Sequence, residues 1–172
     1  NEDQYYSFIS RNFYGVVKIG ESDDARRLYH GTTFHGEQLL DPKLAYIPTT
    51  YYTAPSGIGL AIKYEQLLNK KTPINVGVIG LGTGTLGAYC RKGDRYIFYD
   101  IDPRIEMIAK TKFTYLEYCA GSEVRIGDAR LVLDREHREG QLGNFDLLVV
   151  DAFNSDTIPA HLLTLEAVQL YL

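Results

Sequence analysis

Two neighbouring stretches decide the fold: Asn75-Val-Gly-Val-Ile-Gly-Leu-Gly-Thr-Gly-Thr-Leu-Gly87 and Tyr96-Ile-Phe-Tyr-Asp-Ile-Asp102. The first predicts a buried strand, a glycine-rich turn and a helix at 84–91, and the second predicts a buried strand that ends in acid. Glycines let the backbone pass close to a ligand, and a helix that starts there points its free N–H groups at that ligand. A carboxylate at the end of the next strand can accept hydrogen bonds from two ribose hydroxyls. The two stretches therefore predict a site for a cofactor that carries a nucleoside.

Strands and helices alternate around these stretches. Further apolar strands are expected at 123–127 and 144–151, and helices are expected at 56–69, from 103 onward, at 129–138 and at 159–172. Ser56 is a suitable cap for the first helix. That helix carries apolar residues at helical spacing on one face: Leu60, Tyr64, Leu67 and Leu68. Apolar strands that alternate with helices predict an α/β fold, with a doubly wound parallel sheet covered on both faces.

The first 54 residues follow a different pattern. Residues 5–40 are rich in β-branched and aromatic side chains and are broken by turn residues, which predicts several short strands without a helix. A few strands alone bury too little surface to be stable. We therefore expect a small N-terminal β domain over 1–54, packed against a nucleoside-binding domain over 55–172 or against a partner chain.

The fourth parallel strand raises a question about completeness. With nothing beyond it, the apolar segment 145–150 would be an exposed edge strand, which proteins normally avoid. We expect the natural protein to continue with more strands, so that this sheet is truncated after its fourth strand. Because the first residue is Asn and not Met, we also expect the chain to be a piece of a longer protein.

Composition excludes some classes of protein and site. A net charge of −4 argues against a nucleic-acid partner. Cys90 and Cys119 look like two free, buried thiols of a reducing compartment. No run reaches the roughly eighteen apolar residues of a membrane helix. The four histidines lack metal-ligand spacing, so no metal is expected. We predict a cytoplasmic protein.

The register of the glycines bears on the kind of cofactor. Residues 82–87 match the dinucleotide pattern G-x-G-x-x-G, but the first glycine of that pattern should directly follow the strand. Here Gly80 follows the strand, and in its register Thr85 occupies the position of the third glycine. The spacing of Gly80, Gly82 and Gly84 instead resembles the S-adenosyl loop of Rossmann-like methyltransferases.

Two further acids support a site at this edge of the sheet. Asp100, Asp128 and Asp151 each close a different predicted strand, and ligands of open α/β sheets bind at the carboxyl ends of their strands. Aspartate is also a common helix cap, so either Asp128 or Asp151 alone would be better explained as a cap. Three acids in series behind this loop favour a site.

These motifs resemble the spermidine synthase family of aminopropyltransferases over nearly the whole chain. The resemblance rests on 30–38 in the N-terminal strands, the glycine loop, 99–102, 126–129, 148–151 and 159–163. Two stretches, Gly31-Thr-Thr-Phe-His-Gly36 and Pro48-Thr-Thr-Tyr-Tyr52, resemble more closely a bacterial subgroup of this family. In that subgroup the domain often follows a membrane-spanning region. The fold implied is a Rossmann-like, methyltransferase-type sheet with a small N-terminal β domain.

The resemblance implies transfer of an aminopropyl group from decarboxylated S-adenosylmethionine to a polyamine. It implies that Asp151 is catalytic and that Tyr52 and Asp156 contact the polyamine. The implied cofactor-binding residues are Gln38, Gly80, Gly82, Gly84, Asp100 and Asp128. Asp100 would bind the ribose, Asp128 the adenine, and Gln38 would lie near the aminopropyl arm. A homodimer joined through the β domain is expected, with a membrane region elsewhere in the full-length protein.

The sequence departs from the family near the catalytic residue. The loop Asp151-Ala-Phe-Asn-Ser-Asp156 is longer than usual and lacks the second acid and proline of the family motif. Thr53 stands near the position of a family histidine. Two alternatives therefore stay open: a methyltransferase that uses intact S-adenosylmethionine, and a domain that binds a nucleoside or polyamine without turnover.

Overall fold

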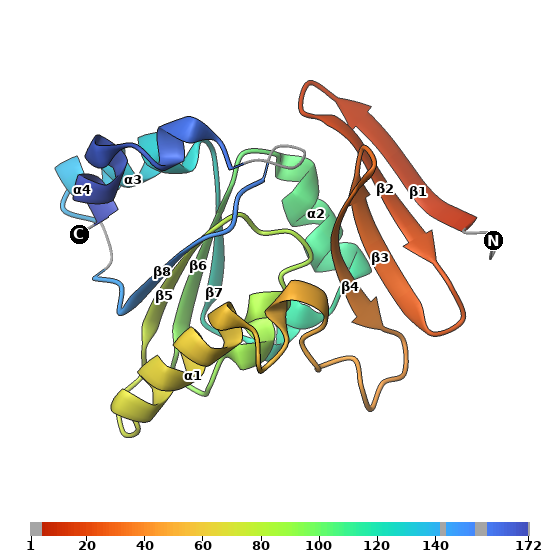
Figure 1. Ribbon diagram of the computed structural model, residues 1–172, viewed down its shortest axis with the longest axis horizontal. Coiled ribbons are helices and arrows are strands. Elements are labelled where there is room, and N and C mark those ends of the chain that lie inside the picture. Colours follow the sequence, from red (N-terminus) through yellow and green to blue (C-terminus); the bar gives the residue numbers. More distant parts are fainter. Residues whose placement is uncertain (1–4, 142–143, 154–157, 172) are drawn as a thin grey trace.

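The computed structural model describes residues 5–141, 144–153 and 158–171, and it contains two four-stranded sheets. Figure 1 shows the two sheets side by side, with helix α2 lying between them. The N-terminal sheet is an antiparallel meander in the order β1-β2-β3-β4. Its strands are β1 (Tyr5–Asn12), β2 (Gly15–Glu21), β3 (Ala25–His30) and β4 (Thr33–Leu39). The expected strands over 5–40 are confirmed.

The second sheet is parallel, as predicted, and has the order β7-β6-β5-β8. Its strands are β5 (Asn75–Ile79), β6 (Arg95–Asp100), β7 (Ser122–Ile126) and β8 (Leu147–Val150). The chain moves outward from β5 to β7 and then returns to the other side of β5. This reversal places a switch point at the carboxyl end of β5, where open α/β sheets bind ligands. Within the described residues, β8 pairs only with β5 and is an edge strand.

Helical elements cover both faces of the parallel sheet, and Figure 1 shows α1 on the opposite side from α3 and α4. One face carries α1 (Gly57–Leu68), α2 (Pro103–Lys112), η2 (Thr85–Tyr89) and η3 (Tyr115–Tyr118). The other carries α3 (Ala129–Arg138), η4 (Ala160–Leu162) and α4 (Leu165–Tyr171). Ser56 caps α1 as predicted, because its hydroxyl accepts a hydrogen bond from Gly59 N. Asp102 caps α2, with Pro103 at its first position.

The helix expected over 84–91 is absent, and a five-residue 3-10 turn, η2, stands in its place. A methyl group on Gly87 would lie 2.7 Å from the carbonyl oxygen of Tyr115, so the backbone of η2 packs directly against η3. This close contact leaves little room for a longer helix. Since η2 is so short, the helix-dipole argument for ligand binding does not apply to it.

The apolar face predicted for α1 exists but does not face the core. Gly59 and Ile62 are the buried residues of α1. The predicted face is about 60% exposed at each position: Leu60 57%, Tyr64 61%, Leu67 60% and Leu68 62%. Helical spacing identifies a shared face but cannot say what covers it.

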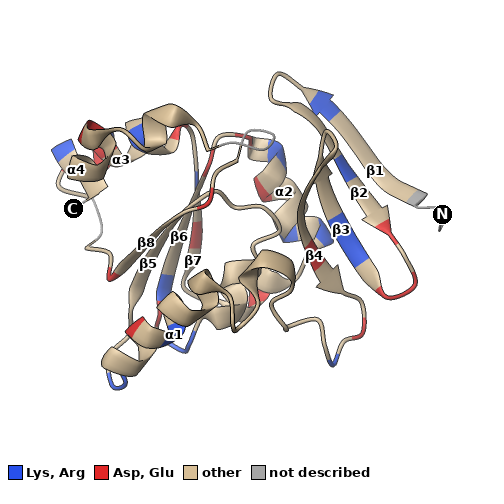
Figure 2. Cartoon of the chain, in the orientation of Figure 1, with Lys and Arg blue, Asp and Glu red and all other residues tan. Residues whose placement is uncertain are grey.

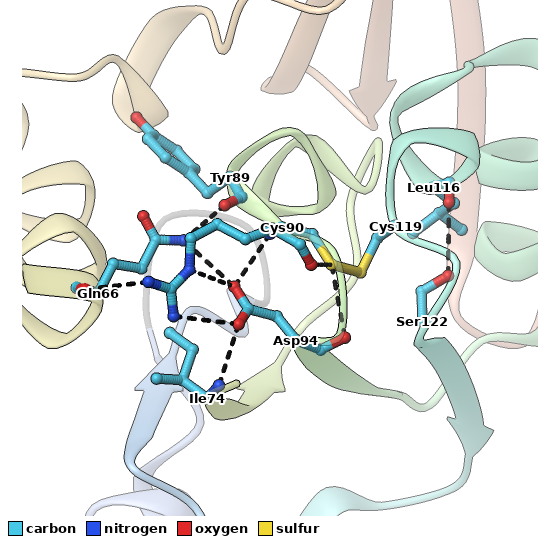
Figure 3. Close-up of a disulfide and its surroundings, with 9 residues drawn as sticks. Gln66, Ile74, Tyr89, Cys90, Asp94, Leu116, Cys119 and Ser122 are labelled. Carbon is cyan, nitrogen blue, oxygen red and sulfur yellow. Dashed lines mark hydrogen bonds and ion pairs between the residues drawn. A yellow bond between two sulfur atoms is a disulfide. The ribbon is translucent and has the colours of Figure 1, made fainter. Parts of the chain in front are cut away.

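The prediction of two free thiols is wrong, because Cys90 and Cys119 form a disulfide (Figure 3). Cys90 ends η2 and Cys119 ends η3, and these two turns pack against each other. Their 29-residue separation in sequence hides this proximity. Disulfides persist mainly in oxidising compartments. The predicted cytoplasmic location therefore loses the support that free thiols gave it.

The N-terminal sheet packs on the parallel-sheet domain, which is one of the two arrangements expected. Gln38 Nε2 donates to Thr114 Oγ1 at 2.7 Å, and Thr114 N donates to Gln38 Oε1 at 3.1 Å. Asn12 Nδ2 donates to Asp102 Oδ1 at 3.1 Å. Arg104 reaches the carbonyl oxygen of Gly15 at 3.3 Å. These bonds hold the N-terminal sheet over the carboxyl end of the parallel sheet.

Candidate active site

A cavity of about 890 Å³ lies where the carboxyl ends of the parallel strands meet the N-terminal sheet. The parallel-sheet side contributes the loops after β5, β6, β7 and β8. The other side is formed by the β1–β2 turn, β3, β4 and η1 (Thr50–Tyr52). A cavity of this volume fits a nucleoside and a small second substrate.

The glycine loop after β5 shapes the floor of the cavity. Gly80 and Gly82 line it, as predicted for cofactor-binding residues. Gly80 has φ +103°, and a methyl group there would lie 2.5 Å from the carbonyl oxygen of Asp151. Only glycine fits this conformation and this close approach. Gly84 lies outside the lining, where a methyl group would meet Leu116 at 2.9 Å.

Asp100 lies at the end of β6, where it lines the cavity beside the glycine loop. Leu81 N donates to its Oδ2 at 3.0 Å and Asp102 N donates to its Oδ1 at 3.0 Å. Each oxygen keeps a second lone pair that could accept from a ribose hydroxyl. Burial raises the pKa of the Asp100 carboxyl, against the lowering effect of those two amide hydrogen bonds.

Asp128, after β7, is both a helix cap and a cavity residue. Its Oδ1 accepts from Leu131 N at 3.2 Å, which confirms the capping role considered for it. Its Oδ2 pairs with His161 Nε2 at 2.9 Å, and both side chains are partly exposed. A role in adenine binding is compatible with the second lone pairs of these oxygens and stays a prediction.

Asp151 follows β8 and is joined to Tyr52 across the cavity. Tyr52 Oη donates to Asp151 Oδ2 at 2.7 Å. Burial raises the pKa of the Asp151 carboxyl, and the Tyr52 hydrogen bond lowers it. Burial is also the main cause that raises the pKa of the Tyr52 hydroxyl, so that hydroxyl stays a donor. The structure thus brings together two residues predicted for catalysis and substrate binding.

The backbone around Tyr52 is fixed from both domains. Thr49 Oγ1 donates to the carbonyl oxygen of Glu37 on β4, and Tyr89 Oη donates to the carbonyl oxygen of Tyr52. Thr50 between them has φ +56°, a left-handed conformation that non-glycine residues rarely adopt. The hydrogen bonds hold this strained turn, which aims Tyr52 at Asp151.

Besides Gly84, one further predicted residue, Gln38, is not placed in the cavity lining. Gln38 is buried, with 4% of its surface exposed, and lies outside the cavity lining. Its amide bonds Ala45 O and Thr114, so its visible role is to join β4 to η3. The place predicted for it, near the aminopropyl arm, stays a prediction. Asp156 lies outside the described residues.

Carboxylates dominate the charge in the cavity. The acids that line it are Asp100, Asp102, Asp128 and Asp151, and the described lining residues include no Lys or Arg. Asp102 is paired with Arg104 at 2.6 Å, behind the lining, so Asp100 and Asp151 are the acids without an ion-pair partner among the described residues. Lys and Arg of the N-terminal sheet, blue on β1 to β3 in Figure 2, lie elsewhere on that sheet. Arg26 and Arg27, for example, pair with Glu21 and Glu37. An anionic cavity favours a cationic ligand over a carboxylate.

Several cavity residues were not predicted from the sequence, among them Asp102, His30, His35 and His161. Asp102 is visible in the motif 99–102 as a second acid, and its position before Pro103 signals a cap. His30 and His35 flank the β3–β4 turn, which projects toward the glycine loop. Only the packing of the two sheets makes them part of the site. Among the residues described, His, Cys, Asp and Glu form no group that could hold a metal ion.

Comparison with known proteins adds independent findings. No family model matches the chain. The polyamine aminopropyltransferase of Vibrio vulnificus (strain CMCP6) is 33% identical over 164 residues, which cover 91% of this chain and 51% of that protein. The crystal structure of spermidine synthase from Thermotoga maritima matches with a TM-score of 0.61 at 17% identity, over 96% of this chain and 52% of that one.

These matches agree with the sequence motifs and with the fold. The structural match covers both sheets, so it bears out a Rossmann-like parallel sheet with an N-terminal β domain. The chain spans about half the length of each relative. In the described part of the chain, no helix is long and apolar enough to cross a membrane. Over the half of these proteins that it spans, the chain is similar in sequence to a polyamine aminopropyltransferase and has the fold of a spermidine synthase.

Proposed function

We propose that this chain carries the nucleoside site and the catalytic carboxylate of an aminopropyltransferase. Its donor would be decarboxylated S-adenosylmethionine and its acceptor an aliphatic amine. The observation that carries the proposal is the half-buried Tyr52–Asp151 pair in a cavity lined by four aspartates and, among its described residues, no Lys or Arg. The relatives named above support this reaction class.

The chemistry requires a base at the acceptor and no acid at the donor. The sulfonium sulfur leaves as a neutral thioether, so the breaking C–S bond needs no protonation. The attacking amine is protonated at neutral pH, and freeing its lone pair costs roughly 4 kcal/mol. A carboxylate beside the amine can take that proton as the C–N bond forms. Burial raises the pKa of Asp151 and so strengthens it as a base.

Tyr52 would orient this base. Its hydroxyl occupies Asp151 Oδ2, which leaves Oδ1 to accept the proton of the amine. Two other acids would bind the nucleoside of the donor, Asp100 at the ribose and Asp128 at the adenine. Gly80 and Gly82 would lie beside them. These two acids and two glycines lie near carboxyl ends of parallel strands or in the loop after β5. The nucleoside would therefore lie along the carboxyl edge of the sheet.

The charge of the cavity separates two candidate donors. Intact S-adenosylmethionine carries a carboxylate that its decarboxylated form lacks. The described lining offers acids and no Lys or Arg to that group, so like charges disfavour the intact cofactor. We expect the decarboxylated form to bind at least tenfold more tightly in a calorimetric titration. Tighter binding of the intact form would favour a methyltransferase.

Turnover tests the proposal directly. Release of methylthioadenosine is measured by chromatography with decarboxylated S-adenosylmethionine and a series of amines. Asp151→Asn should lower the rate by about 10²–10⁴-fold, the usual contribution of a positioned base, with methylthioadenosine affinity retained. Asp146→Asn, a control in the turn before β8, should leave the rate unchanged. If the unmutated chain binds nucleoside and amine but releases no product, the domain is a binding module.

A further inference from the structure

One aromatic ring of the cavity lining lies on the turn between β1 and β2. Phe13 lines the cavity, and with 96% of its surface exposed it is the most exposed large apolar residue in the described part of the chain. A single exposed ring on a protein surface needs no explanation in itself. Phe13 differs from that case because the turn that carries it is fixed, and because it is fixed to the acids of the proposed nucleoside site.

The turn is held first from within the N-terminal sheet. Tyr14 N donates to Asn12 Oδ1 at 2.7 Å, and the carbonyl oxygen of Tyr14 lies 2.6 Å from His30 Nε2. Gly15 closes the turn with φ +115°, and a methyl group there would lie 2.6 Å from the same His30 nitrogen. This conformation and this close approach both require glycine. The ring is therefore presented on a turn of defined shape.

The turn is also tied to the end of β6, where the proposed ribose acid lies. Figure 1 shows it on the same side of the molecule as the start of α2. Asn12 Nδ2 donates to Asp102 Oδ1 at 3.1 Å, and Asp102 N donates to Asp100 Oδ1 at 3.0 Å. Arg104 pairs with Asp102 at 2.6 Å and donates to the carbonyl oxygen of Gly15 at 3.3 Å. Two hydrogen bonds thus lead from the β1–β2 turn to Asp100.

The surface around Phe13 suits a flat, uncharged group. Its ring meets the Tyr14 ring nearly at a right angle, with centroids 5.5 Å apart at 85°, which is an edge-to-face contact. Because Phe13 is almost fully exposed, this contact leaves a ring face open. Ile101, between the two acids in sequence, also lines the cavity and is 46% exposed. A heterocyclic base stacks on such a ring without needing a hydrogen-bond partner.

We propose that Phe13 stacks on the base of the bound nucleoside and covers it from the side of the N-terminal sheet. This assignment rests on the proposed function, in which Asp100 binds the ribose. Asp128 would contact the edge of the base, whereas Phe13 would contact its face. The two domains would then share the nucleoside, with the acids on one and the stacking ring on the other.

Contacts with the edge and with the face of the base predict different selectivity. Stacking depends on the ring face and tolerates changes in the groups attached to the base. A hydrogen bond from the base amino group to Asp128 is lost when a carbonyl replaces that amino group. Methylthioinosine should therefore bind less tightly than methylthioadenosine, yet it should lose the same further factor when the Phe13 ring is removed.

Calorimetric titration of both nucleosides into the full chain measures the contribution of the ring. Phe13→Ala removes the ring, and Phe13→Tyr keeps it as the matched control. Since Phe13 is almost fully exposed, both variants should fold, which circular dichroism checks. Phe13→Ala should weaken binding of each nucleoside roughly 5- to 150-fold, the range for a base stacked on an aromatic side chain. Phe13→Tyr should stay within about threefold of the unmutated chain.

A second measurement reports the stacking itself. The chain contains no tryptophan, so Phe13→Trp introduces a single indole, whose fluorescence a stacked base quenches. Ile9→Trp is the matched control, because Ile9 is 60% exposed on β1 and lies outside the cavity lining. Methylthioadenosine should quench the emission of Phe13→Trp with the midpoint found by calorimetry for that variant. The emission of Ile9→Trp should not change.

The outcomes keep the two proposals apart. Equal methylthioadenosine affinity in Phe13→Ala and the unmutated chain, or binding to Phe13→Trp without quenching, would overturn the role of Phe13 and leave the nucleoside site in place. Ring-dependent binding and quenching without turnover of decarboxylated S-adenosylmethionine would support the role of Phe13 and refute the aminopropyl transfer. If the unmutated chain binds neither nucleoside, both proposals are refuted.

Discussion

The two walls of the cavity differ in chemistry because they come from two kinds of sheet. The parallel sheet supplies carboxylates, since its strands all end at the same edge and three of them have an acid at their last residue or within two residues after it, at Asp100, Asp128 and Asp151. The antiparallel N-terminal sheet supplies rings, because its strands expose a row of aromatic side chains beside the mouth. Parallel strands concentrate residues at an edge, whereas antiparallel strands spread them over a face.

The contrast assigns a different task to each wall. Acids at a sheet edge can bind a ribose, an adenine amino group and a reacting ammonium at separate points. Ring faces can attract a cation. The hydrogen bonds between the walls include Tyr52–Asp151, Gln38–Thr114 and Asn12–Asp102. Three predictions test how the walls are held together and how each works.

The largest effect is expected from the disulfide, which ties the turn after the glycine loop to η3. Thr114, just before η3, is hydrogen-bonded to Gln38, and Tyr115, the first residue of η3, donates to the carbonyl oxygen of Glu37. Both partners belong to β4 of the N-terminal sheet. By fixing η3, the disulfide therefore stabilises the packing of the two walls. Replacing Cys90 and Cys119 by Ala should lower the free energy of unfolding by roughly 3–4 kcal/mol. Chemical denaturation measures this loss.

Reduction of the unmutated chain provides the matched control for that change. Dithiothreitol should destabilise the unmutated chain by a similar amount and leave the Cys90→Ala, Cys119→Ala variant unaffected. If reduction leaves the unfolding midpoint unchanged, the disulfide is not a brace between the walls.

A smaller effect is expected from Asp100, the half-buried acid at the end of β6 in the parallel-sheet wall. Asp100→Asn keeps the shape of the side chain but removes its charge and one acceptor of a backbone amide. Methylthioadenosine affinity should fall roughly 10- to 100-fold, the loss of one or two hydrogen bonds to a charged group. Asp128→Asn, at a partly exposed site, should cost less. Calorimetry compares the two, and a greater loss for Asp128→Asn would reverse the assigned ranking.

The smallest effect concerns the contact where the walls meet. The Tyr52 hydrogen bond lowers the pKa of Asp151, so Tyr52→Phe should raise that pKa further. With a higher pKa, Asp151 takes up its proton at a higher pH as the pH falls, and the base is lost earlier. Carbon-13 NMR of the labelled carboxyl follows this titration directly. We also expect turnover at neutral pH to fall about tenfold. If the titration of Asp151 is unchanged in Tyr52→Phe, Tyr52 does not set the pKa of the proposed base.

Much of the parallel sheet was predictable from local patterns. Apolar runs bounded by glycine and acid identify β5, β6 and β8, and capping residues identify the starts of α1 and α2. The position of the three acids at one edge follows from the parallel arrangement alone. The glycine register correctly places Gly80 directly after the strand, where its missing side chain lets Asp151 approach.

Other features depend on packing and could not be predicted in this way. The length of η2 is limited by its contact with η3, and the exposure of the α1 face depends on what lies beside it. Gln38 is in the predicted strand, yet its amide turns to Thr114 and not into the cavity. In each case the deciding neighbour is remote in the chain.

The sequence by itself determined the alternation of strands and helices, the turn after β5 and the acids at the strand ends. These features arise from residue spacing and from backbone preferences within a few positions. Only the tertiary structure decided the Cys90–Cys119 bond, the Tyr52–Asp151 contact across 99 positions and the ring contact between Phe34 and Tyr51. These contacts depend on how the two sheets pack, and packing is a property of surfaces assembled from distant segments.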